Sequence, residues 1–393
     1  MSRLGTTHPS PVATALGGLI AMAVGLGVGR FVYTPILPPM LAALGLSKST
    51  AGLIASANFA GYLAGALGAT RATLPGSRRR WLLGALLASA ATTAAMGLTT
   101  SVAAFLALRF LGGVASALAL ILASALVLDR LAEAGRPGLM ALHFAGVGCG
   151  IAVSAALVAT QLAEGASWAA MWLASGAVSL LGLVAVALLV PAGHEPVVVS
   201  YAAGGGARDP RLRRITLAYG LFGFGYVITA TFLVAIVRAT PAIRPLEPVI
   251  WVVVGLAAAP SVLFWSRLSQ RIGIPAAFAI AALAEAVGVL ASVVWPSVVG
   301  ICLAALLVGG TFMGLTALGL VRGRELAQGE MAPGRTVVRD PRRVMAAMTG
   351  AFGVGQIIGP TLAGVLSDAL GGFSVPSVLA AGALVVAAGL ARR

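Results

Sequence analysis

The sequence contains little charge, and acidic residues are the scarcest of all. Charged residues make up 9% of the 393 residues, and none of the 11 acidic residues precedes Asp129. Soluble domains carry about 25% charged residues, because a soluble chain must cover its core with a polar shell. This composition therefore excludes an ordinary soluble protein.

Residues that carry catalysis or bind metals are also rare. The two cysteines, Cys149 and Cys302, lie inside apolar segments and indicate neither a disulfide framework nor a metal site. The chain has one lysine, Lys48, whereas the phosphate-binding loop of ATPases needs a lysine directly after its glycines. No catalytic pair or triad stands out. We therefore expect no enzyme activity, no cofactor and no metal.

Long apolar runs are abundant. Hydrophobic residues make up 59% of the chain, and its mean hydropathy is +1.01. A helix of about 20 apolar residues crosses the hydrocarbon core of a bilayer. We predict an all-α integral membrane protein with twelve transmembrane helices. The predicted spans are 12–43, 48–69, 81–99, 101–128, 138–162, 167–190, 213–238, 247–266, 275–295, 298–321, 343–369 and 374–391.

The basic residues predict how the chain is oriented in the membrane. With these spans, 21 of the 26 basic residues fall on the side of the N-terminus, 3 fall on the other side and 2 lie inside spans. Because cytoplasmic loops are enriched in Lys and Arg, we expect both termini in the cytoplasm and the protein in a cell inner membrane. The net charge of +15 then reflects topology, and we expect no nucleic-acid partner.

The two halves of the sequence resemble each other. GVGRF at 27–31 matches GFGYV at 223–227 with an offset of 196, which places Tyr226 where Arg30 lies. GVGCGI at 146–151 matches GVGQII at 353–358. Parallel repeats of this kind are typical of secondary transporters. We predict a six-helix bundle in 1–190, a glycine-rich cytoplasmic linker in 191–212 and a second six-helix bundle in 213–393.

Four motifs resemble the major facilitator superfamily, and more narrowly its YbfB/YjiJ-type branch. They are GVGRFVYTPILPPM at 27–40, RFLGGVASAL at 109–118, HFAGVGCGIAVSAAL at 143–157 and MTGAFGVGQIIGPTLAGVLSD at 348–368. The resemblance implies a transporter that works by alternating access, with spans 1, 4, 7 and 10 around a central cavity. Arg30, Arg109 and Tyr226 would then lie on cavity helices.

The loops of the chain depart from the superfamily pattern. The loop after span 2 usually holds an aspartate, but residues 65–81 contain no acid, and the equivalent loop WSRLSQRIG (265–273) has Gln270 at that place. A gating ion pair in these loops is therefore not expected. The remaining arginines could instead meet the C-terminal ends of neighbouring helices.

Two arginines inside spans are the sharpest functional signal. A guanidinium does not lose its proton, and placing it in hydrocarbon costs several kcal/mol. Arg30 could hold an anionic group of a substrate, or it could bind carbonyls that the following prolines release. Arg109 could take part in proton coupling, as the resemblance implies, or bond to the backbone of span 1. Together they would make the cavity positive and favour anions.

Other polar and aromatic residues in the spans complete the predicted sites. Each could contact a substrate or simply pack between helices. We predict substrate binding by Arg30, Tyr33, Asn58, Tyr62, Arg109, Tyr219, Tyr226 and Gln356. We predict proton coupling by Arg109, His143 and Glu285; for His143 and Glu285 the alternative is a hydrogen bond between helices.

These observations predict a monomeric secondary active transporter for a small organic solute, with an anion preferred and protons as the coupling ion. The first alternative is efflux of drug-like amphiphiles, although cation exporters usually need a carboxylate in the cavity. The second alternative is a membrane sensor or a lipid-handling protein without coupled transport.

Overall fold

The computed structural model describes residues 10–71, 76–191, 209–328 and 341–392, and these residues form helices without any strand. The helices are α1 Pro11–Met22, α2 Tyr33–Leu44, α3 Lys48–Arg71, α4 Arg78–Ala95, α5 Val102–Glu133, α6 Met140–Ala163, α7 Trp168–Leu189, α8 Pro210–Ala239, α9 Glu247–Ala258, α10 Ser261–Ile272, α11 Ile274–Val294, α12 Val298–Gln328, α13 Pro341–Leu370 and α14 Ser374–Arg392.

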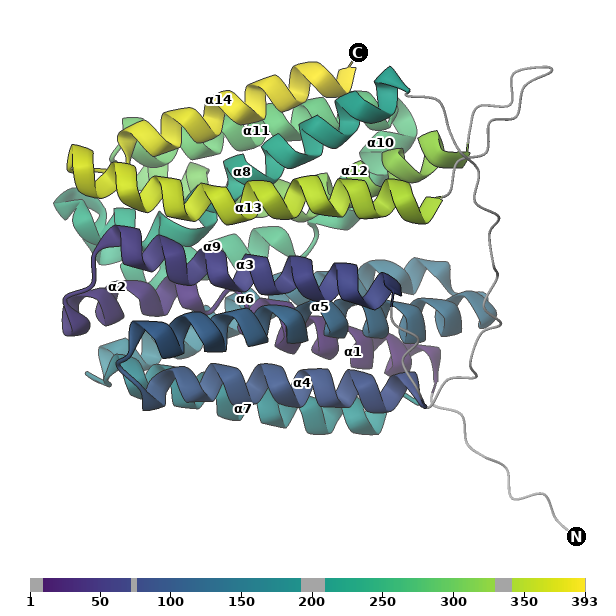
Figure 1. Cartoon of the computed structure of the whole chain (residues 1–393), viewed down its shortest axis with the longest axis horizontal. Coiled ribbons are helices and arrows are strands. Elements are labelled where there is room, and N and C mark those ends of the chain that lie inside the picture. The colour runs from purple at the N-terminus through teal and green to yellow at the C-terminus, as the bar shows by residue number, and fades with distance from the viewer. Residues whose placement is uncertain (1–9, 72–75, 192–208, 329–340, 393) are drawn as a thin grey trace, which may run out of the picture.

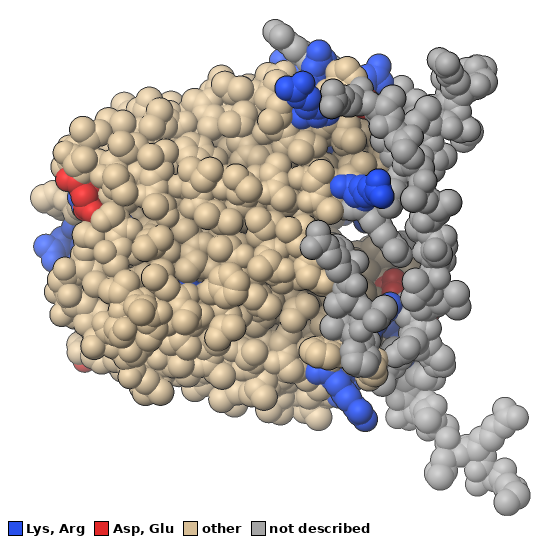
Figure 2. Space-filling model, viewed as in Figure 1, with Lys and Arg blue, Asp and Glu red and all other residues tan. Residues whose placement is uncertain are grey.

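The predicted transmembrane architecture is confirmed. Among the residues that the structure describes, twelve segments are long and apolar enough to cross a membrane. They run back and forth, so that α1 begins and α14 ends at the same end of the bundle (Figure 1), which we call the terminal face. Figure 2 shows a broad belt with almost no Lys, Arg, Asp or Glu on the visible surface, while most basic residues lie at the terminal face. The other end is called the opposite face.

The helices form two halves that meet along two equivalent pairs. In Figure 1, α1–α7 lie in the lower half and α8–α14 in the upper half. The halves meet where α3 contacts α13 and where α6 contacts α9. The sequence repeat exchanges these two pairs, as expected for a pseudo-twofold arrangement. Thr34 donates a hydrogen bond of 2.7 Å to the carbonyl of Ala230, its repeat equivalent 196 residues later. The predicted linker 191–212 falls mostly outside the described residues, so the domain boundaries stay a prediction.

The first span is broken directly before its prolines, all three of which lie in α2. Residues Ala23–Val28 form a π-helical turn, residues 29–32 form an irregular turn, and α2 follows. Bonds from Gly29 to Val24 and from Phe31 to Leu26 span five residues instead of four. Pro38 and Pro39 lie inside α2. The loosened glycine-rich turn precedes Pro38 and Pro39, whereas Pro35 lies in the first turn of α2, directly after the irregular turn.

The segment after span 8 is a helix, whereas the sequence suggested a loop. α9 ends at Ala258, and α10 begins at Ser261 after a short turn that contains Pro260. WSRLSQRIG is therefore helical up to Ile272, and Gly273 ends the helix with φ 83°. A proline at the start of a helix leaves no unpaired N–H, which lets the chain bend and continue as a helix.

Glycines bring the two halves into direct backbone contact. A Cβ added to Gly255 of α9 would lie 2.8 Å from both the Gly148 carbonyl oxygen and the Ala152 Cα of α6. No real Cβ fits at such distances from backbone atoms, so both helices need a small residue at this crossing. The GVGCG motif of α6 thus provides one side of a close helix crossing.

Arg79, at the terminal face, has the structural role that the sequence suggested for arginines outside the spans. Arg79, at the start of α4, donates through Nε to the Val190 carbonyl at 2.7 Å and through Nη2 to the Ala187 carbonyl. These carbonyls belong to the C-terminal end of α7, where intrahelical donors run out. A cation at this end also complements the helix dipole.

Candidate functional site

Arg109 holds the break in the first span. Its Nη1 and Nη2 atoms donate to the carbonyls of Gly29 and Arg30, each at 3.0 Å. Its guanidinium carbon also lies 5.0 Å from the centre of the Tyr33 ring. The side chain is 4% exposed. The irregular turn leaves carbonyls without helical partners, and a fork of N–H donors from α5 satisfies two of them.

Arg30 is buried in the same region, and some of its N–H donors have no hydrogen-bond partner. It is 6% exposed, and its Nε and Nη2 atoms have no hydrogen-bond partner. Its guanidinium carbon lies 4.5 Å from the centre of the Phe59 ring and 4.6 Å from that of Tyr62. Two aromatic faces attract the cation by up to about 2 kcal/mol each, yet they satisfy no N–H. The carbonyl-binding role that the sequence left open for Arg30 is filled by Arg109.

Asn58 and Tyr62 are four residues apart and share one face of α3. The Asn58 side-chain amide donates to the Arg109 carbonyl at 2.9 Å, while its Oδ1 atom has no partner. Asn58 therefore ties α3 to α5 and leaves one acceptor free next to the arginines. Tyr62 contributes its ring to Arg30.

Tyr33 faces away from any open space. Its hydroxyl donates to the Ala51 carbonyl at 2.8 Å, and its ring packs on Trp172 at 6.3 Å between centroids. With Arg109 over its ring, Tyr33 fixes α2 against α3. This arrangement fits a packing role better than a contact with substrate.

The second half places a stack of aromatic rings at mid-span. The Tyr226 ring is parallel to Phe312 and to Phe352, with interplanar angles of 8° and centroid distances of 5.7 and 6.0 Å. The Gln356 amide donates to the Tyr226 hydroxyl, and the Gln356 Oε1 atom is left without a partner. Tyr226 and Gln356, predicted from separate spans, therefore form one unit.

Two contacts connect the second half to the broken first span, and one of them comes from the aromatic stack. Phe31, next to Arg30, packs edge-on against Phe312 with 5.7 Å between centroids. The Trp251 indole of α9 donates to the Phe31 carbonyl at 3.2 Å. The aromatic stack thus reaches the break across the interface of the halves.

Sequence reasoning did not find several of these residues. The missed side chains are Phe31, Phe59, Trp251, Phe312 and Phe352. Aromatic residues make up only 6% of the chain. Because they are so few, an aromatic residue near the middle of a predicted span was the feature that could have identified these side chains.

Tyr219 belongs to the packing of the second half. Its hydroxyl donates to the Thr316 carbonyl at 3.3 Å, and its ring stacks on Phe352 at 4.7 Å. Phe222 lies between Tyr219 and Tyr226, with ring centroids 5.9 and 5.1 Å away. The aromatic stripe of α8 therefore continues the stack towards the terminal face.

The two other proton-coupling candidates are both buried. The His143 Nε2 atom is 3.1 Å from the Ser124 hydroxyl, which joins α6 to α5. Glu285 of α11 is fully buried, and neither carboxyl oxygen has a hydrogen-bond partner. Thr311 of α12 lies beside it, but the Thr311 hydroxyl donates to the Leu307 carbonyl at 2.7 Å. Glu285 therefore lies inside the protein.

The halves are fastened together at the opposite face. The Asp368 carboxylate accepts hydrogen bonds from the backbone amides of Lys48 and Ser49, at 3.1 and 2.8 Å. The Lys48 ammonium donates to the Ser367 carbonyl at 3.3 Å and lies 5.3 Å from the Phe373 ring. Because the first amides of a helix lack intrahelical partners, the end of α13 caps the start of α3.

Known structures share this fold. A point mutant of the nucleoside transporter NupG superimposes with a TM-score of 0.73 and 16% identity, over 96% of this chain and 98% of that chain. A bacterial homologue of the human lysosomal transporter Spinster, in an inward-facing and unoccupied conformation, gives 0.72 and 15%, over 98% and 97%. At these identities the likeness concerns the fold.

The family model gives the closer assignment. Comparison with curated proteins yields no significant match. The model described as "Uncharacterised MFS-type transporter YbfB" matches residues 22–392. This match spans both halves and includes the broken first span. The chain therefore belongs to the YbfB-type family of major facilitator superfamily transporters, as its motifs indicated.

Proposed function

We propose that this secondary transporter carries small organic anions and that protons drive the transport. The observation that carries the anion proposal is the guanidinium of Arg30, buried with Nε and Nη2 unpaired. An unsatisfied buried donor costs about 1–3 kcal/mol, and more when it is charged. A carboxylate accepts two N–H bonds from a guanidinium at once, so an anionic substrate would remove this cost.

The surroundings of Arg30 support the same substrate class. The first half contributes no acid to the spans around it, since no acidic residue precedes Asp129. The free acceptors of Asn58 and Gln356 lie on the neighbouring helices α3 and α13. They would accept from hydroxyl or amide groups on the rest of the solute. In a low-dielectric site the unbalanced cation attracts anions and repels cations.

Alternating access would use the interface between the halves. The bonds of Asp368 to α3 close the opposite face. At the glycine-lined crossing of α6 and α9 the backbones touch without bulky side chains between them, so the halves could tilt against each other there. Release of the Asp368 bonds would open the site to the opposite face.

The proton proposal rests on Glu285. A charged carboxylate without partners costs several kcal/mol inside a membrane protein, so Glu285 would hold a proton in this conformation and release it in another. Glu285→Gln mimics the protonated state. In proteoliposomes, we expect this variant to exchange substrate across the membrane but to lose accumulation driven by a pH gradient. If accumulation persists unchanged, Glu285 is not the carrier.

We also propose the orientation and assembly of the protein. The bias of 21 basic residues to one side supports a cytoplasmic terminal face in an inner membrane. A reporter enzyme fused to the C-terminus tests this orientation. Reporter activity outside the cytoplasm would contradict it. We propose a monomer, which light scattering of the detergent-solubilised protein would refute if the protein mass were twice 39.1 kDa.

Efflux of aromatic amphiphiles is the second candidate. The parallel rings of Phe312, Tyr226 and Phe352 favour it, since flat ring systems stack on such faces. The absence of a carboxylate around Arg30 in the first half speaks against cationic amphiphiles.

Thermal stabilisation by ligands tests the anion proposal. A panel of organic carboxylates, organic cations and neutral nucleosides would be added to the purified protein, since a ligand stabilises the fold in proportion to the logarithm of its concentration over its affinity. We expect a carboxylate to stabilise the wild type and Arg30→Met to lose at least tenfold in affinity. Arg244→Met, which removes an exposed arginine, is the matched control. Equal stabilisation of wild type and Arg30→Met by cations or nucleosides would refute the anion proposal.

A further inference from the structure

One segment of α12 is bonded to a side chain of another helix through its backbone. The Ser261 hydroxyl of α10 donates to the Gly310 carbonyl at 2.8 Å and accepts from the Gly314 amide at 3.0 Å. An α-helix normally joins two such backbone groups directly, because they lie four residues apart. The Trp265 indole of α10 donates to the same Gly310 carbonyl at 2.8 Å. A side chain inserted into the hydrogen bonds of a helix marks a point where the helix bends. We call residues 310–314 the bridged segment.

Three consecutive residues of the bridged segment face three different neighbours. Gly310 faces α10, as its two bonds show. Thr311 lies beside Glu285 of α11. Phe312 faces α8, with its ring parallel to Tyr226 and 5.7 Å between the centroids. A small rotation of the segment therefore changes all three contacts at once.

The packing of α11 on α12 explains why Glu285 meets Thr311. The two helices are joined by a short turn and are antiparallel. A Cβ added to Gly288 of α11 would lie 2.8 Å from the Leu307 Cβ of α12, and Glu285 comes opposite Thr311 about one helical turn further along. Both Glu285 oxygens lack a hydrogen-bond partner, whereas the Thr311 hydroxyl donates to the Leu307 carbonyl at 2.7 Å. The hydroxyl beside this carboxyl group is therefore engaged elsewhere in this conformation.

Tyr226 is the ionisable residue that α8 places near Glu285. Its hydroxyl interacts electrostatically with Glu285 and with Arg30, and it accepts a hydrogen bond from the Gln356 amide. The proposed proton site and the proposed solute site are therefore close enough for the state of one to affect the other.

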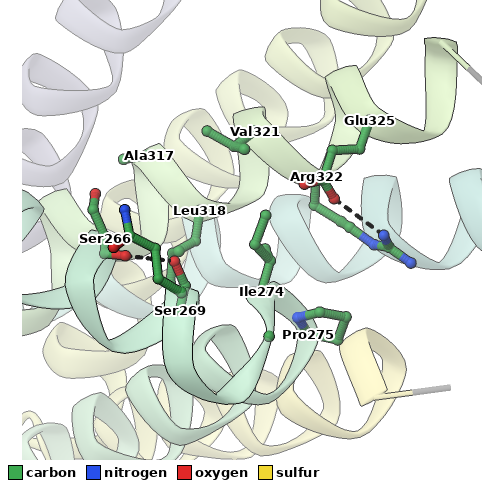
Figure 3. A pocket seen from close by; sticks show the side chains of 11 residues that line it. Ser266, Ser269, Ile274, Pro275, Ala317, Leu318, Val321, Arg322 and Glu325 are labelled. Atoms are coloured by element: carbon green, nitrogen blue, oxygen red, sulfur yellow. Dashed lines mark hydrogen bonds and ion pairs between the residues drawn. The ribbon is translucent and has the colours of Figure 1, made fainter. Parts of the chain in front are cut away.

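The charged residues of the helices around α11 lie towards the ends of those helices. In α8, α10, α12 and α14 they are Arg211, Arg213, Arg214, Arg238, Arg267, Arg271, Arg322, Arg324, Glu325 and Arg392. Figure 3 shows Arg322 beside Glu325 in a cavity of about 570 Å³ between α10, α11 and α12. Arg322 follows Thr311 on α12 by roughly 16 Å along the helix axis. None of these described residues is a hydrogen-bond partner of Glu285.

We infer that Thr311 couples the proton on Glu285 to the position of Phe312 beside the solute site. When Glu285 gives its proton to water, the Thr311 hydroxyl leaves the Leu307 carbonyl and donates to the carboxylate, because a hydrogen bond to a charged group is the stronger of the two. Thr311 is a positioning residue, since it acts through Phe312. The inference rests on the proposed role of Glu285 as the proton carrier.

The new bond changes the surroundings of the solute site. Phe312 packs edge-on against Phe31, which is the neighbour of Arg30 in the chain. As Thr311 turns towards α11, the bridged segment rotates and draws Phe312 away from Phe31. The contact between the halves is then looser at the depth of Arg30. Ser261 holds the point about which the segment rotates.

Hydrogen exchange of backbone amides, measured by mass spectrometry, tests the inference without a solute. The full-length protein is measured in one detergent across a pH series, and the rate for the peptide that covers residues 310–314 is normalised to the intrinsic exchange rate at each pH. The test variant, Thr311→Val, keeps the shape of the side chain and removes its hydroxyl. The matched control is Thr316→Val, because the Thr316 hydroxyl also donates four residues back on α12, to the Phe312 carbonyl at 2.8 Å. Thr311→Ser restores a hydroxyl, and Thr311→Ala replaces Thr311→Val if the valine variant does not fold.

We expect the normalised rate to rise about tenfold as Glu285 loses its proton, which is the effect of one hydrogen bond to a charged group. The wild type, Thr316→Val and Thr311→Ser should show this rise. Thr311→Val and Glu285→Gln should not. An equal rise in Thr311→Val and the wild type overturns the coupling role of Thr311.

The accumulation assay for Glu285→Gln separates this inference from the proposed function. If Glu285→Gln loses accumulation while the wild-type peptide shows no rise with pH, Glu285 carries the proton and the inference about Thr311 fails alone. If Glu285→Gln keeps accumulation, the proposed proton carrier fails, and the inference fails with it.

Discussion

At the residue scale, the two buried arginines, Arg30 of the first span and Arg109 of α5, have different surroundings and therefore different roles. Arg109 donates to two carbonyls that have no helical partner. Arg30 lies against two rings and keeps two unpaired nitrogens. The first arrangement stabilises the fold, while the second costs stability and fits a residue kept for a ligand.

Methionine variants of the two arginines separate these roles. Arg109→Met leaves the carbonyls of Gly29 and Arg30 unpaired, which costs about 1–3 kcal/mol each, so we expect a clearly lower unfolding temperature. Arg30→Met removes a buried cation with two unpaired nitrogens and keeps apolar contacts with the rings of Phe59 and Tyr62, so we expect stability equal to or above that of the wild type. Thermal unfolding in one detergent measures both. If Arg30→Met is as unstable as Arg109→Met, Arg30 is a structural clamp.

The sequence placed both arginines correctly inside spans but could not tell their roles apart. Burial in hydrocarbon follows from span length alone, whereas hydrogen-bond partners depend on which helices meet. Phe59 and Phe312 contact Arg30 and Phe31 from other spans. No local pattern in the sequence connects those positions.

At the element scale, span positions were predictable because a helix must satisfy its own backbone in lipid. Deviations inside spans were harder to predict. The π-helical turn at Ala23–Val28 and the turn at Pro260 both keep the chain apolar, so hydropathy does not change there. A proline lies next to both breaks, because Pro35 is in the first turn of α2 and Pro260 is in the turn before α10, while Pro38 and Pro39 are accommodated inside α2.

The crossing of α6 and α9 is a place where a single added methyl group should disturb the contact between the halves. In Gly255→Ala the new Cβ would meet backbone atoms of Gly148 and Ala152 at 2.8 Å, and backbone cannot move aside as a side chain can. We expect a loss of about 1–3 kcal/mol in stability and a several-fold slower transport rate. Thermal unfolding and proteoliposome uptake measure these effects.

Gly382→Ala on α14 is the matched control for this crossing. A Cβ there has no neighbour within 4 Å, so we expect unchanged or slightly raised stability, by up to about 1 kcal/mol from helix propensity. Identical behaviour of the two alanine variants would show that α6 and α9 are not in tight contact.

At the scale of the whole molecule, the repeat in the sequence relates helices that face each other across the two halves. The offset of 196 residues aligns Thr34 with Ala230, and these two residues bond across the interface. The departure in the loops was also informative. The first half has no acid before Asp129, and an acid that fastens the halves, Asp368, lies at the opposite face.

Asp368 should therefore set the balance between closed and open states of the opposite face. Asp368→Asn weakens a cap on α3, and losing a cap costs about 1 kcal/mol, which shifts a two-state equilibrium about fivefold towards the open state. The readout is labelling of Ala230→Cys by a membrane-impermeant maleimide, in a Cys149→Ser/Cys302→Ser background. Ala230 is 6% exposed in the closed arrangement, so its labelling rate reports opening.

Glu164→Gln removes an acid from the same face but only from the first half, and it should leave the rate unchanged. Equal rates for Asp368→Asn and Glu164→Gln would mean that the glycine crossing, and not Asp368, controls closure.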